Sequence, residues 1–429
     1  MADDAPAEPT AYQHLEAIVG LSPAPEYRRF GSPGMAHVAD YVAGVLTDAG
    51  YAVSQREVAA NRWQVEYAPG HEPMLEILAT GALPATESAF SLGATTTAQG
   101  VTCVVRAIED VQPGDCGWVP FEVASPEWNN VTADPSGAVA DIATRGGVAA
   151  VIEGDTSRDA LLALQIRQSL PAVVVNATEA EVVGQQVRVR AMGAPAPATT
   201  HDVVAMRPPA DPSRGYVVLL GHLDGWFAAA ADNGSGSAAI LRAARLLADQ
   251  PPSGAGVLVV LVDGEEVGMH GSRAVAADLG SEAGLVVDPH GPALHWADLE
   301  AVLNLDAPTA RPSDVQEPIA GGPTAEPPVF QWRAFVLSGS VALMDQFVVA
   351  FAAHGVLGLP IKAGVAEHLN GGMNRTDARW FRAARIPVFW PVTGYPEYHT
   401  SADTLAAVDP VDLEALAEGS ADALRAVGA

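Results

Sequence analysis

Basic residues are scarce in this chain of 429 residues. Lysine and arginine together number 23 against 51 acidic residues, Lys362 is the only lysine, and the formal net charge is −28 at neutral pH. Because nucleic acids and anionic membranes attract basic surfaces, this composition argues against both as partners. Most of the carboxylates must form a solvated surface, so a single Asp or Glu is weak support for any function.

Long apolar runs and cysteines are scarce as well. Hydrophobic residues make up 49% of the chain, yet no apolar run approaches the roughly 20 residues that a membrane span needs. The opening stretch MADDAPAEPT has neither the basic region nor the apolar core of a signal peptide, which predicts a cytoplasmic protein, or a secreted one whose signal has been removed. Cys103 and Cys116 lack zinc-finger spacing and predict either one disulfide or two buried free thiols.

The length predicts two domains, since one domain typically has about 100 to 200 residues. Residues 88–199 alternate short strands and helices without a cluster of metal ligands, so we expect them to form a smaller inserted α/β domain that acts as a lid or spacer. Residues 1–87 and 200–429 then form a discontinuous catalytic domain. Three prolines in Thr199–Pro212 predict a linker from the insert back to the main sheet.

Three short apolar runs in the second part of the chain have the composition of buried parallel strands. They are Tyr216–Leu220, Val257–Val262 and Ala301–Leu305, and the first two flank a predicted helix over Ser235–Asp249. Polar residues follow each run. Because open α/β sheets bind ligands beyond the carboxyl ends of their strands, the pattern predicts an α/β fold with a site at that edge.

The residues that follow these strands are ligands that zinc prefers. Between Gly221 and Ser272 the chain reads GHLDGW, ADNGSG and DGEEVGMHGS, which places His222 and Asp232 near Glu265 and Glu266. Two adjacent carboxylates behind a buried strand repel each other unless a cation or a proton lies between them. The motifs therefore predict a metallohydrolase, although His222 as a core histidine, Asp232 as a helix cap and the Glu pair as a solvated turn stay open as alternatives.

Two further ligands follow from position at a strand end. Asp306 follows the third apolar run and is preferred to Asp288. His399, in EYHTSADT after a predicted strand at Ile386–Pro391, is preferred to the other candidates, which are His270, His290, His295, His354 and His368. Asp224 stands two residues after His222 and is expected to accept a hydrogen bond from its second ring nitrogen.

The ordered motifs GHLDGW, ADNGSG, GEEVGMHGS, LNLD and YHTSADT resemble the M28 family of zinc aminopeptidases and related dizinc exopeptidases. RRFGSPG (Arg28–Gly34) and TDARWF (Thr376–Phe381) resemble that family as well. The resemblance implies a three-layer α/β/α zinc-exopeptidase fold with a mixed, mainly parallel central sheet. The insert resembles the protease-associated (PA) domain found within such enzymes.

The resemblance also implies a role for each site residue and the presence of two Zn²⁺ ions. One ion takes His222, Asp232 and Asp306, and the other takes Asp232, Glu266 and His399, so that the carboxylate of Asp232 bridges them. A cis peptide bond between Asp232 and Asn233 is expected to hold this carboxylate. Three residues would act beside the metals: Glu265 as the general base, Asp224 to orient His222, and Tyr398 as a hydrogen-bond donor to the oxyanion.

The expected function is therefore a dizinc metallo-exopeptidase that removes N-terminal residues from peptides, using a hydroxide between the metals. Three alternatives remain at this point. They are a carboxypeptidase or dipeptidase, for which Arg333, Arg375 and Arg379 offer a carboxylate partner, a single-zinc enzyme like glutaminyl cyclase, and a catalytically dead receptor-like protein. The sequence predicts neither the oligomeric state nor the side-chain preference.

Overall fold

The computed structural model describes residues 8–65, 72–88, 90–91, 94–120, 135–155, 159–163, 165–166, 170–309, 333–370, 372–395 and 397–429. The chain forms two compact units. The first comprises Met1–Val58, Thr199–Tyr395 and Thr404–Ala429, and the second comprises Ala59–Ala198 and Pro396–Asp403. The first border between the units lies at residues 58/59 instead of the predicted 87/88. A short segment near the C-terminus, Pro396–Asp403, also belongs to the second unit.

An eight-stranded mixed sheet forms the centre of the first unit, in the order β1-β11-β13-β12-β14-β17-β15-β16. β12 pairs in parallel with both β13 and β14, and β14 pairs in parallel with β17, whereas β11 is antiparallel to β13 and β15 to β17. The strands are β1 (Ala52–Val65), β11 (Gly193–Arg207), β12 (Tyr216–His222), β13 (Gly256–Val262), β14 (Leu299–Asn304), β15 (Arg333–Ser338), β16 (Leu359–Lys362) and β17 (Val388–Thr393).

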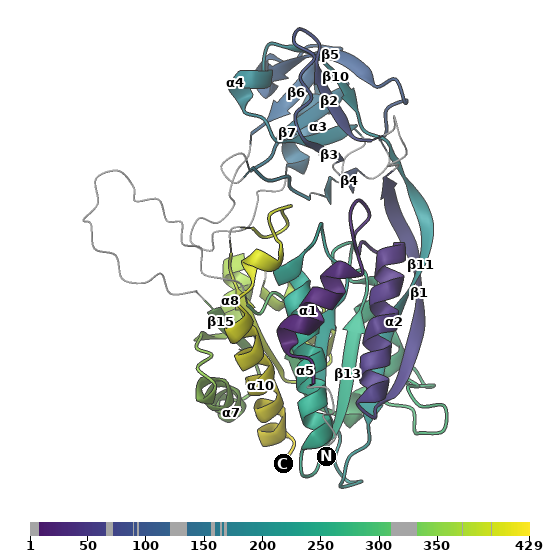
Figure 1. The fold of residues 1–429 in the computed structure, drawn as a ribbon, viewed down its shortest axis with the longest axis vertical. Coiled ribbons are helices and arrows are strands. Elements are labelled where there is room, and N and C mark those ends of the chain that lie inside the picture. Colours follow the sequence, from purple (N-terminus) through teal and green to yellow (C-terminus); the bar gives the residue numbers. More distant parts are fainter. Residues whose placement is uncertain are drawn as a thin grey trace, which may run out of the picture. The chain divides into compact units, whose positions relative to one another are not determined.

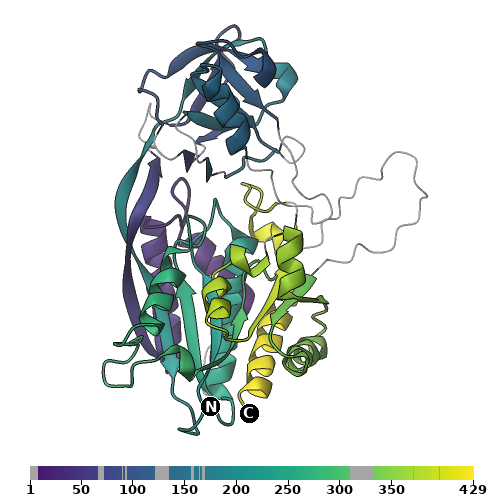
Figure 2. The ribbon, with the colours of Figure 1, turned by 180° about the vertical axis from the view of Figure 1, so that it is seen from behind.

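Helices cover both faces of this sheet, which gives the expected α/β/α arrangement. α1 (Ala11–Gly20), α2 (Pro33–Asp48) and α10 (Pro410–Val427) contact α5 (Gly236–Asp249) on one face (Figure 1). α6 (His270–Leu279) and α9 (Ala378–Ala383) contact each other on the opposite face (Figure 2). Further helical segments are α7 (Val341–Ala353), which packs on α10, α8 (Ala363–Asn370), η3 (Ala230–Ser235), η4 (Trp296–Asp298), η5 (Gly372–Arg375) and η6 (Leu405–Ala407).

The predicted central strands are confirmed, and one predicted loop is wrong. Every residue of β12 and β13 is buried, as their continuous apolar sequences require. The predicted linker Thr199–Pro212 is instead largely strand, because residues up to Arg207 belong to β11 and pair with β13 from Val203 onward. The prolines begin only at Pro208, where the pairing has ended.

The second unit contains a seven-stranded sheet of its own, in the order β2-β10-β5-β6-β7-β9-β3. One apolar cluster includes Val139 and Ile142 of α3, and another includes Val182 of α4. The elements are β2 (Met74–Ile77), β3 (Thr86–Ser88), β4 (Phe90–Ser91), β5 (Val101–Ala107), η1 (Ile108–Asp110), β6 (Cys116–Val119), α3 (Ser136–Thr144), β7 (Ala149–Glu153), β8 (Gln165–Ile166), β9 (Ala172–Val175), α4 (Glu179–Val182) and β10 (Gln186–Arg190).

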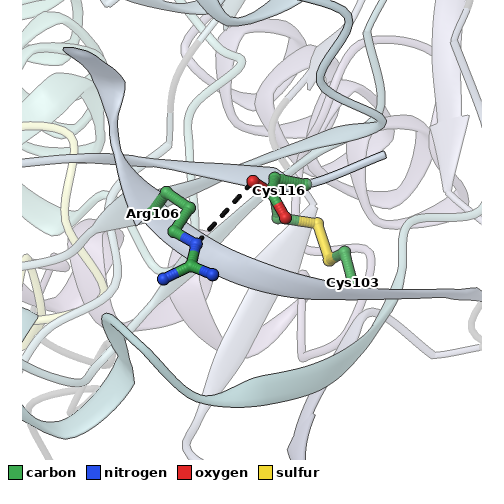
Figure 3. The surroundings of a disulfide bond; sticks show 4 residues. Cys103, Arg106 and Cys116 are labelled. Carbon is green, nitrogen blue, oxygen red and sulfur yellow. Dashed lines mark ion pairs between the residues drawn. A yellow bond between two sulfur atoms is a disulfide. The ribbon is translucent and has the colours of Figure 1, made fainter. Parts of the chain in front are cut away.

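The two cysteines form a disulfide between β5 and β6 (Figure 3). Of the two alternatives that the sequence left open, free thiols are therefore excluded. Both half-cystines are buried in the apolar cluster of the second unit. Among the described residues, no helix is long and apolar enough to cross a membrane.

Candidate metal centre

The candidate metal ligands of the first unit lie at adjacent strand ends. His222 is the last residue of β12, Glu265 and Glu266 follow β13, and Asp306 follows β14. β12 lies between β13 and β14 in the sheet. The chain therefore runs from β12 to β13 on one side and later adds β14 on the other side of β12. Such a switch point leaves a crevice beyond the strand ends, which is where ligands bind in open α/β sheets.

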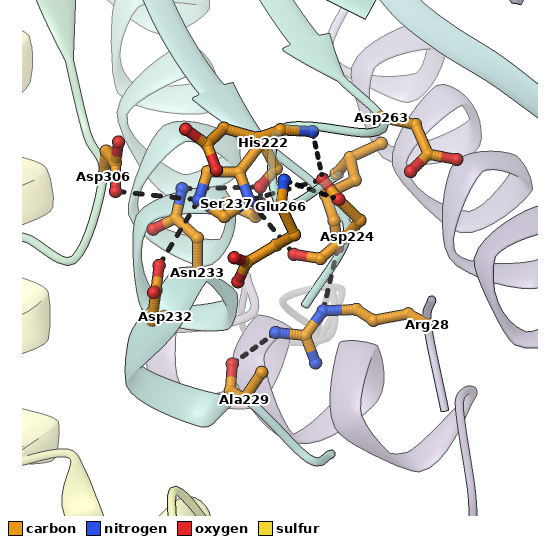
Figure 4. Close-up of polar contacts among 12 residues, drawn as sticks. Arg28, His222, Asp224, Ala229, Asp232, Asn233, Ser237, Asp263, Glu266 and Asp306 are labelled. Atoms are coloured by element: carbon orange, nitrogen blue, oxygen red, sulfur yellow. Dashed lines mark hydrogen bonds and ion pairs between the residues drawn. The ribbon is translucent and has the colours of Figure 1, made fainter. Parts of the chain in front are cut away.

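His222, Asp232 and Asp306 come together as one buried group (Figure 4). The Nε2 atom of His222 lies 3.3 Å from Oδ1 of Asp232 and 3.6 Å from Oδ1 of Asp306. The three donor atoms lie within 4.8 Å of one another, and the residues are 1%, 4% and 8% exposed. One imidazole nitrogen and two carboxylate oxygens at this spacing fit a divalent zinc ion.

Asp224 contacts both His222 and the turn that follows β13. Nδ1 of His222 lies 3.1 Å from the main-chain oxygen of Asp224 and 3.4 Å from its Oδ1. The two carboxylate oxygens of Asp224 also accept hydrogen bonds from the main-chain N–H groups of Glu265 and Glu266, each at 3.1 Å. Asp224 therefore fixes the imidazole and the Glu265–Glu266 turn together, a connection that the sequence did not reveal.

The surrounding carboxylates change the protonation of His222 and Glu265. Burial alone would lower the pKa of His222, but hydrogen bonds to Asp224, Asp232 and Asp306 outweigh it and raise that pKa well above the usual value. Loss of solvent around the carboxyl of Glu265 raises its pKa well above the usual range. The charge of His222 lowers this pKa and that of Asp306 raises it further, so that the net shift is upward. A cation in this cluster would favour the ionised carboxylates.

Trp226 is a site residue that sequence reasoning missed. Its Nε1 donates a hydrogen bond of 2.9 Å to Oε2 of Glu266, and the indole is buried. This contact helps to fix the orientation of the Glu266 carboxylate. The motif GHLDGW contains the tryptophan, but no local spacing rule connects it to a glutamate 40 residues later.

Arg28 explains the first part of the RRFGSPG motif. Its guanidinium is buried and donates hydrogen bonds to the main-chain oxygens of Leu223, Ala228 and Ala229 (Figure 4). Ala229 has a left-handed backbone with φ 46°, a conformation that is unfavourable for a residue with a Cβ atom. Arg28 therefore holds the loop between His222 and Asp232 in its conformation.

The small residues of that loop are required by close packing. Ala229, Ala230 and Ala231 are all buried, and a Cβ atom at Gly225 would lie only 2.6 Å from Cβ of Ala229. The Ala228–Ala231 run, which seems featureless in the sequence, thus leaves space for the Arg28 guanidinium and for the turn that contains Asp232.

Asn233 connects the turn at Asp232 to the next strand. The predicted cis peptide bond between Asp232 and Asn233 is confirmed. Nδ2 of Asn233 donates to the main-chain oxygen of Leu305 at 2.8 Å, and its Oδ1 accepts from the N–H of Ala307 at 3.2 Å. These bonds tie Asp232 to the segment that contains Asp306.

His399 and Tyr398 belong to the second unit, in the segment Pro396–Asp403. Their rings stack with centroids 3.9 Å apart, and His399 has a left-handed backbone with φ 57°. The ligand role of His399 and the donor role of Tyr398 stay predictions.

Several competing candidates have other structural roles. His354 contacts Glu418 and Asp422 of α10 through its two ring nitrogens, at 3.1 and 2.8 Å. His270 begins α6 and its ring lies against Phe30. Asp288 accepts a hydrogen bond from the N–H of His290 within a turn.

Comparison with known proteins identifies the family. Residues 202–424 match the model of peptidase family M28. The chain belongs to peptidase family M28. It is therefore a metallopeptidase, and the site described above lies within the matched region. No curated protein sequence matches the chain.

Solved structures of M28 peptidases share its fold. A peptidase M28 precursor from Shewanella amazonensis SB2B is 17% identical, with a TM-score of 0.72, and the match covers 98% of this chain and 93% of that one. A zinc aminopeptidase from Bacillus subtilis is 16% identical (TM-score 0.69; 96% and 93% covered), and an aminopeptidase from Aneurinibacillus sp. strain AM-1 is 18% identical (TM-score 0.60; 97% and 92% covered).

Replacement of Arg28 tests its role in this M28 peptidase. We expect Arg28→Lys to weaken zinc binding and to lower the free energy of unfolding by several kcal/mol, because each buried carbonyl that loses its partner costs about 1–3 kcal/mol. Lysine keeps the charge but lacks the planar fork that reaches several carbonyls. Urea denaturation and zinc titration are the measurements. Arg245→Lys, a change in a partly exposed ion pair, is the control and should have little effect; equal effects of both variants would contradict the assigned role.

The buried Asp202 should make the stability of the zinc-free protein depend on pH. Burial raises the pKa of Asp202 from 3.8 to about 7, partly opposed by a hydrogen bond from the N–H of Asp263 and by the Arg56 guanidinium. The folded state thus binds this proton more tightly than the unfolded state, so its stabilising contribution is complete below pH 3.8 and is lost as the pH rises through about 7.

We therefore expect the free energy of unfolding of the zinc-free protein to decrease between pH 5 and pH 8, and to decrease less in Asp202→Asn. Urea denaturation across this range is the measurement. Asp278→Asn removes the more exposed carboxylate partner of the same Arg56. This control should show the same dependence of the free energy of unfolding on pH as the wild type. An unchanged slope in Asp202→Asn would show that Asp202 does not titrate in this range.

Proposed function

We propose that this M28 peptidase is a dizinc aminopeptidase that hydrolyses the N-terminal residue of peptides. The observation that carries the proposal is the buried group of His222, Asp232 and Asp306 at the carboxyl ends of β12 and β14, next to the Glu265–Glu266 turn. The zinc-binding character of the donor set, the family and the motif order all support it.

Five residues are proposed as metal ligands. His222, Asp232 and Asp306 would hold one zinc ion, and Asp232, Glu266 and His399 the other, with Asp232 shared. When bound, the two ions lower the pKa of a water molecule toward neutrality and polarise the scissile carbonyl. The assignment of His399 rests on the YHTSADT motif.

Glu265 is proposed as the general base. Its main-chain N–H is fixed by Asp224, so its backbone is held in place beside the ligands without the side chain being used for that purpose. Burial raises the pKa of the Glu265 carboxyl, and a general base accepts and returns a proton most effectively when its pKa lies near the working pH. Glu265 would take a proton from the attacking water and return it to the leaving amine, while Tyr398 donates a hydrogen bond to the oxyanion.

The charge of the site favours a substrate with a free amino terminus. Glu265 follows β13 and Asp306 follows β14, the two strands that flank β12, and the chain as a whole carries a net charge of −28, which attracts cations. Of the arginines that a carboxypeptidase would need, Arg333 is buried and already bonded to the main-chain oxygen of Pro308 and to Asp412. Arg375 and Arg379 leave a carboxypeptidase as the alternative to be tested.

Two properties outside the site belong to the proposal. We propose that the second unit contains a PA-like domain, on the basis of the sequence resemblance of residues 88–199. We also propose that the protein functions in an oxidising compartment, because disulfides such as Cys103–Cys116 persist mainly in such compartments.

The substitution Glu265→Gln tests the mechanism. Because a general base is not a ligand, we expect the variant to keep both zinc ions and its affinity for substrate, and to lose about 10²- to 10⁴-fold in kcat. Elemental analysis and steady-state kinetics are the measurements, with the exposed Glu282→Gln as a control of the same chemical change. Loss of one ion in Glu265→Gln would mean that Glu265 and Glu266 exchange roles, and a single ion in the wild type would favour the cyclase-like alternative.

Blocking either end of a peptide substrate tests the direction of attack. We expect N-terminal acetylation of a good substrate to abolish cleavage, since it removes the ammonium that the acidic site binds, and C-terminal amidation to change the rate little. Product release from the two modified peptides, followed by mass spectrometry, is the measurement. Cleavage of the acetylated peptide together with loss of cleavage of the amidated one would replace the aminopeptidase by a carboxypeptidase, with the same metal chemistry.

A further inference from the structure

The segment that contains Tyr398 and His399 is hydrogen-bonded to residues 161–163, within the second unit. In the sequence it lies between β17 and η6, which belong to the first unit. The N–H of Ala163 donates to the main-chain oxygen of His399 at 2.9 Å, and the N–H of Ser401 donates to the oxygen of Leu161 at 2.8 Å. Together with the antiparallel bridge between Leu162 and Thr400, these bonds form a short two-stranded contact, which we call the 161–163 bridge.

A side chain adds a third hydrogen bond to the 161–163 bridge. Oγ of Ser401 accepts from the N–H of Leu161 at 3.0 Å, so Leu161 uses both its N–H and its oxygen to bind Ser401. The hydroxyl of Ser401 therefore offers a side-chain position at which the bridge can be weakened without a change to the main chain.

The partner strand of the bridge is fixed in the core of the second unit. Leu162 is 2% exposed and belongs to the apolar cluster that contains Ile152 of β7 and Val174 of β9. Ala160 precedes it and donates its N–H to the oxygen of Asp155 at 3.0 Å, just after β7. Residues 160–163 therefore provide a rigid support rather than a free loop.

The supported segment has a conformation that local preferences do not favour. His399 is left-handed with φ 57°, which for a residue with a large side chain persists only where the surroundings fix it. Within the segment, Thr400 donates its N–H and its hydroxyl to the oxygen of Glu397. The peptide group that follows His399 is held from outside, because its oxygen is the acceptor for Ala163.

We propose that the second unit positions the imidazole of His399 and the phenol of Tyr398 through the 161–163 bridge, and is thus a working part of the metal centre rather than a lid or spacer. This inference rests on the proposed dizinc function, in which His399 is a ligand of the second ion only. Positioning contacts of this kind typically contribute 10- to 100-fold to metal affinity. Weakening the bridge should therefore release the second ion and leave the ion held by His222, Asp232 and Asp306 in place.

The substitution Ser401→Ala, made in the full-length protein, tests the proposal. It removes the acceptor for the Leu161 N–H and leaves the metal ligands unchanged. We expect the dissociation constant of the second zinc ion to rise about 10- to 100-fold, with that of the first unchanged, in competition titrations with a chelator. Ser401→Thr keeps a hydroxyl and should restore most of the affinity.

Ser281→Ala is the matched control, because Oγ of Ser281 likewise accepts a main-chain N–H, that of Gly284, at 3.1 Å in a turn of the first unit. It should leave both zinc affinities at the wild-type values. Hydrogen exchange gives a second readout that needs neither zinc nor activity: the amides of Ala163 and Ser401 should exchange slowly in the wild type and faster in Ser401→Ala.

The outcomes distinguish the dizinc function from the positioning role of the 161–163 bridge. A wild-type protein that binds one zinc ion would contradict the dizinc function itself. If the wild type binds two ions and Ser401→Ala retains both with unchanged affinity, or weakens both equally, the positioning role of the bridge is overturned while the dizinc function stands. Fast exchange of the Ala163 and Ser401 amides in the wild type would overturn it as well.

Discussion

The concentration of like charges at one edge of the main sheet is the constraint on which the rest of the first unit depends. Asp232, Asp306 and Asp224 all lie within 4 Å of the ring nitrogens of one histidine, His222. Burial of carboxylates in such numbers costs free energy unless protons or cations compensate for the charge. In the metal-free protein the pKa of His222 is raised for this reason, because a proton on the imidazole supplies part of the positive charge that the carboxylates need.

Main-chain N–H groups and uncharged side-chain donors hold the carboxylates of this cluster in place. The chain has few basic residues that could serve instead. Asp224 binds two consecutive N–H groups after β13, Trp226 donates its indole N–H to Glu266, and Asn233 joins two strand ends. Arg28, the cation of the loop, donates to main-chain oxygens and not to a carboxylate in the hydrogen bonds described. The hydrogen bonds that fix this loop therefore use main-chain oxygens as acceptors rather than the ligand carboxylates.

The sequence predicted this edge of the sheet well because the information is local. Continuous apolar runs mark β12 and β13, and ligand residues follow them directly, so fold and site could be placed from the same stretch of chain. Arg28 and Trp226 could not be assigned partners, because Arg28 binds a carbonyl 195 positions away and Trp226 a carboxylate 40 positions away. The end of β11 was missed because Pro208, Pro209 and Pro212 follow it closely and indicate a linker, and the pairing of Cys103 with Cys116 depends on strand register that composition does not report.

The segment Pro396–Asp403 contains the proposed ligand His399 and belongs to the second unit, although the chain on both sides of it belongs to the first. A ligand in a left-handed backbone has to be held in that conformation, and the short turn around His399 makes only a few bonds within itself. Main-chain hydrogen bonds also join this segment to residues 161–163, which are anchored in the apolar core of the second unit. If His399 is a metal ligand, as we propose, the second metal position is complete only when the second unit is folded, and the folding of that unit and the occupancy of this position become linked equilibria.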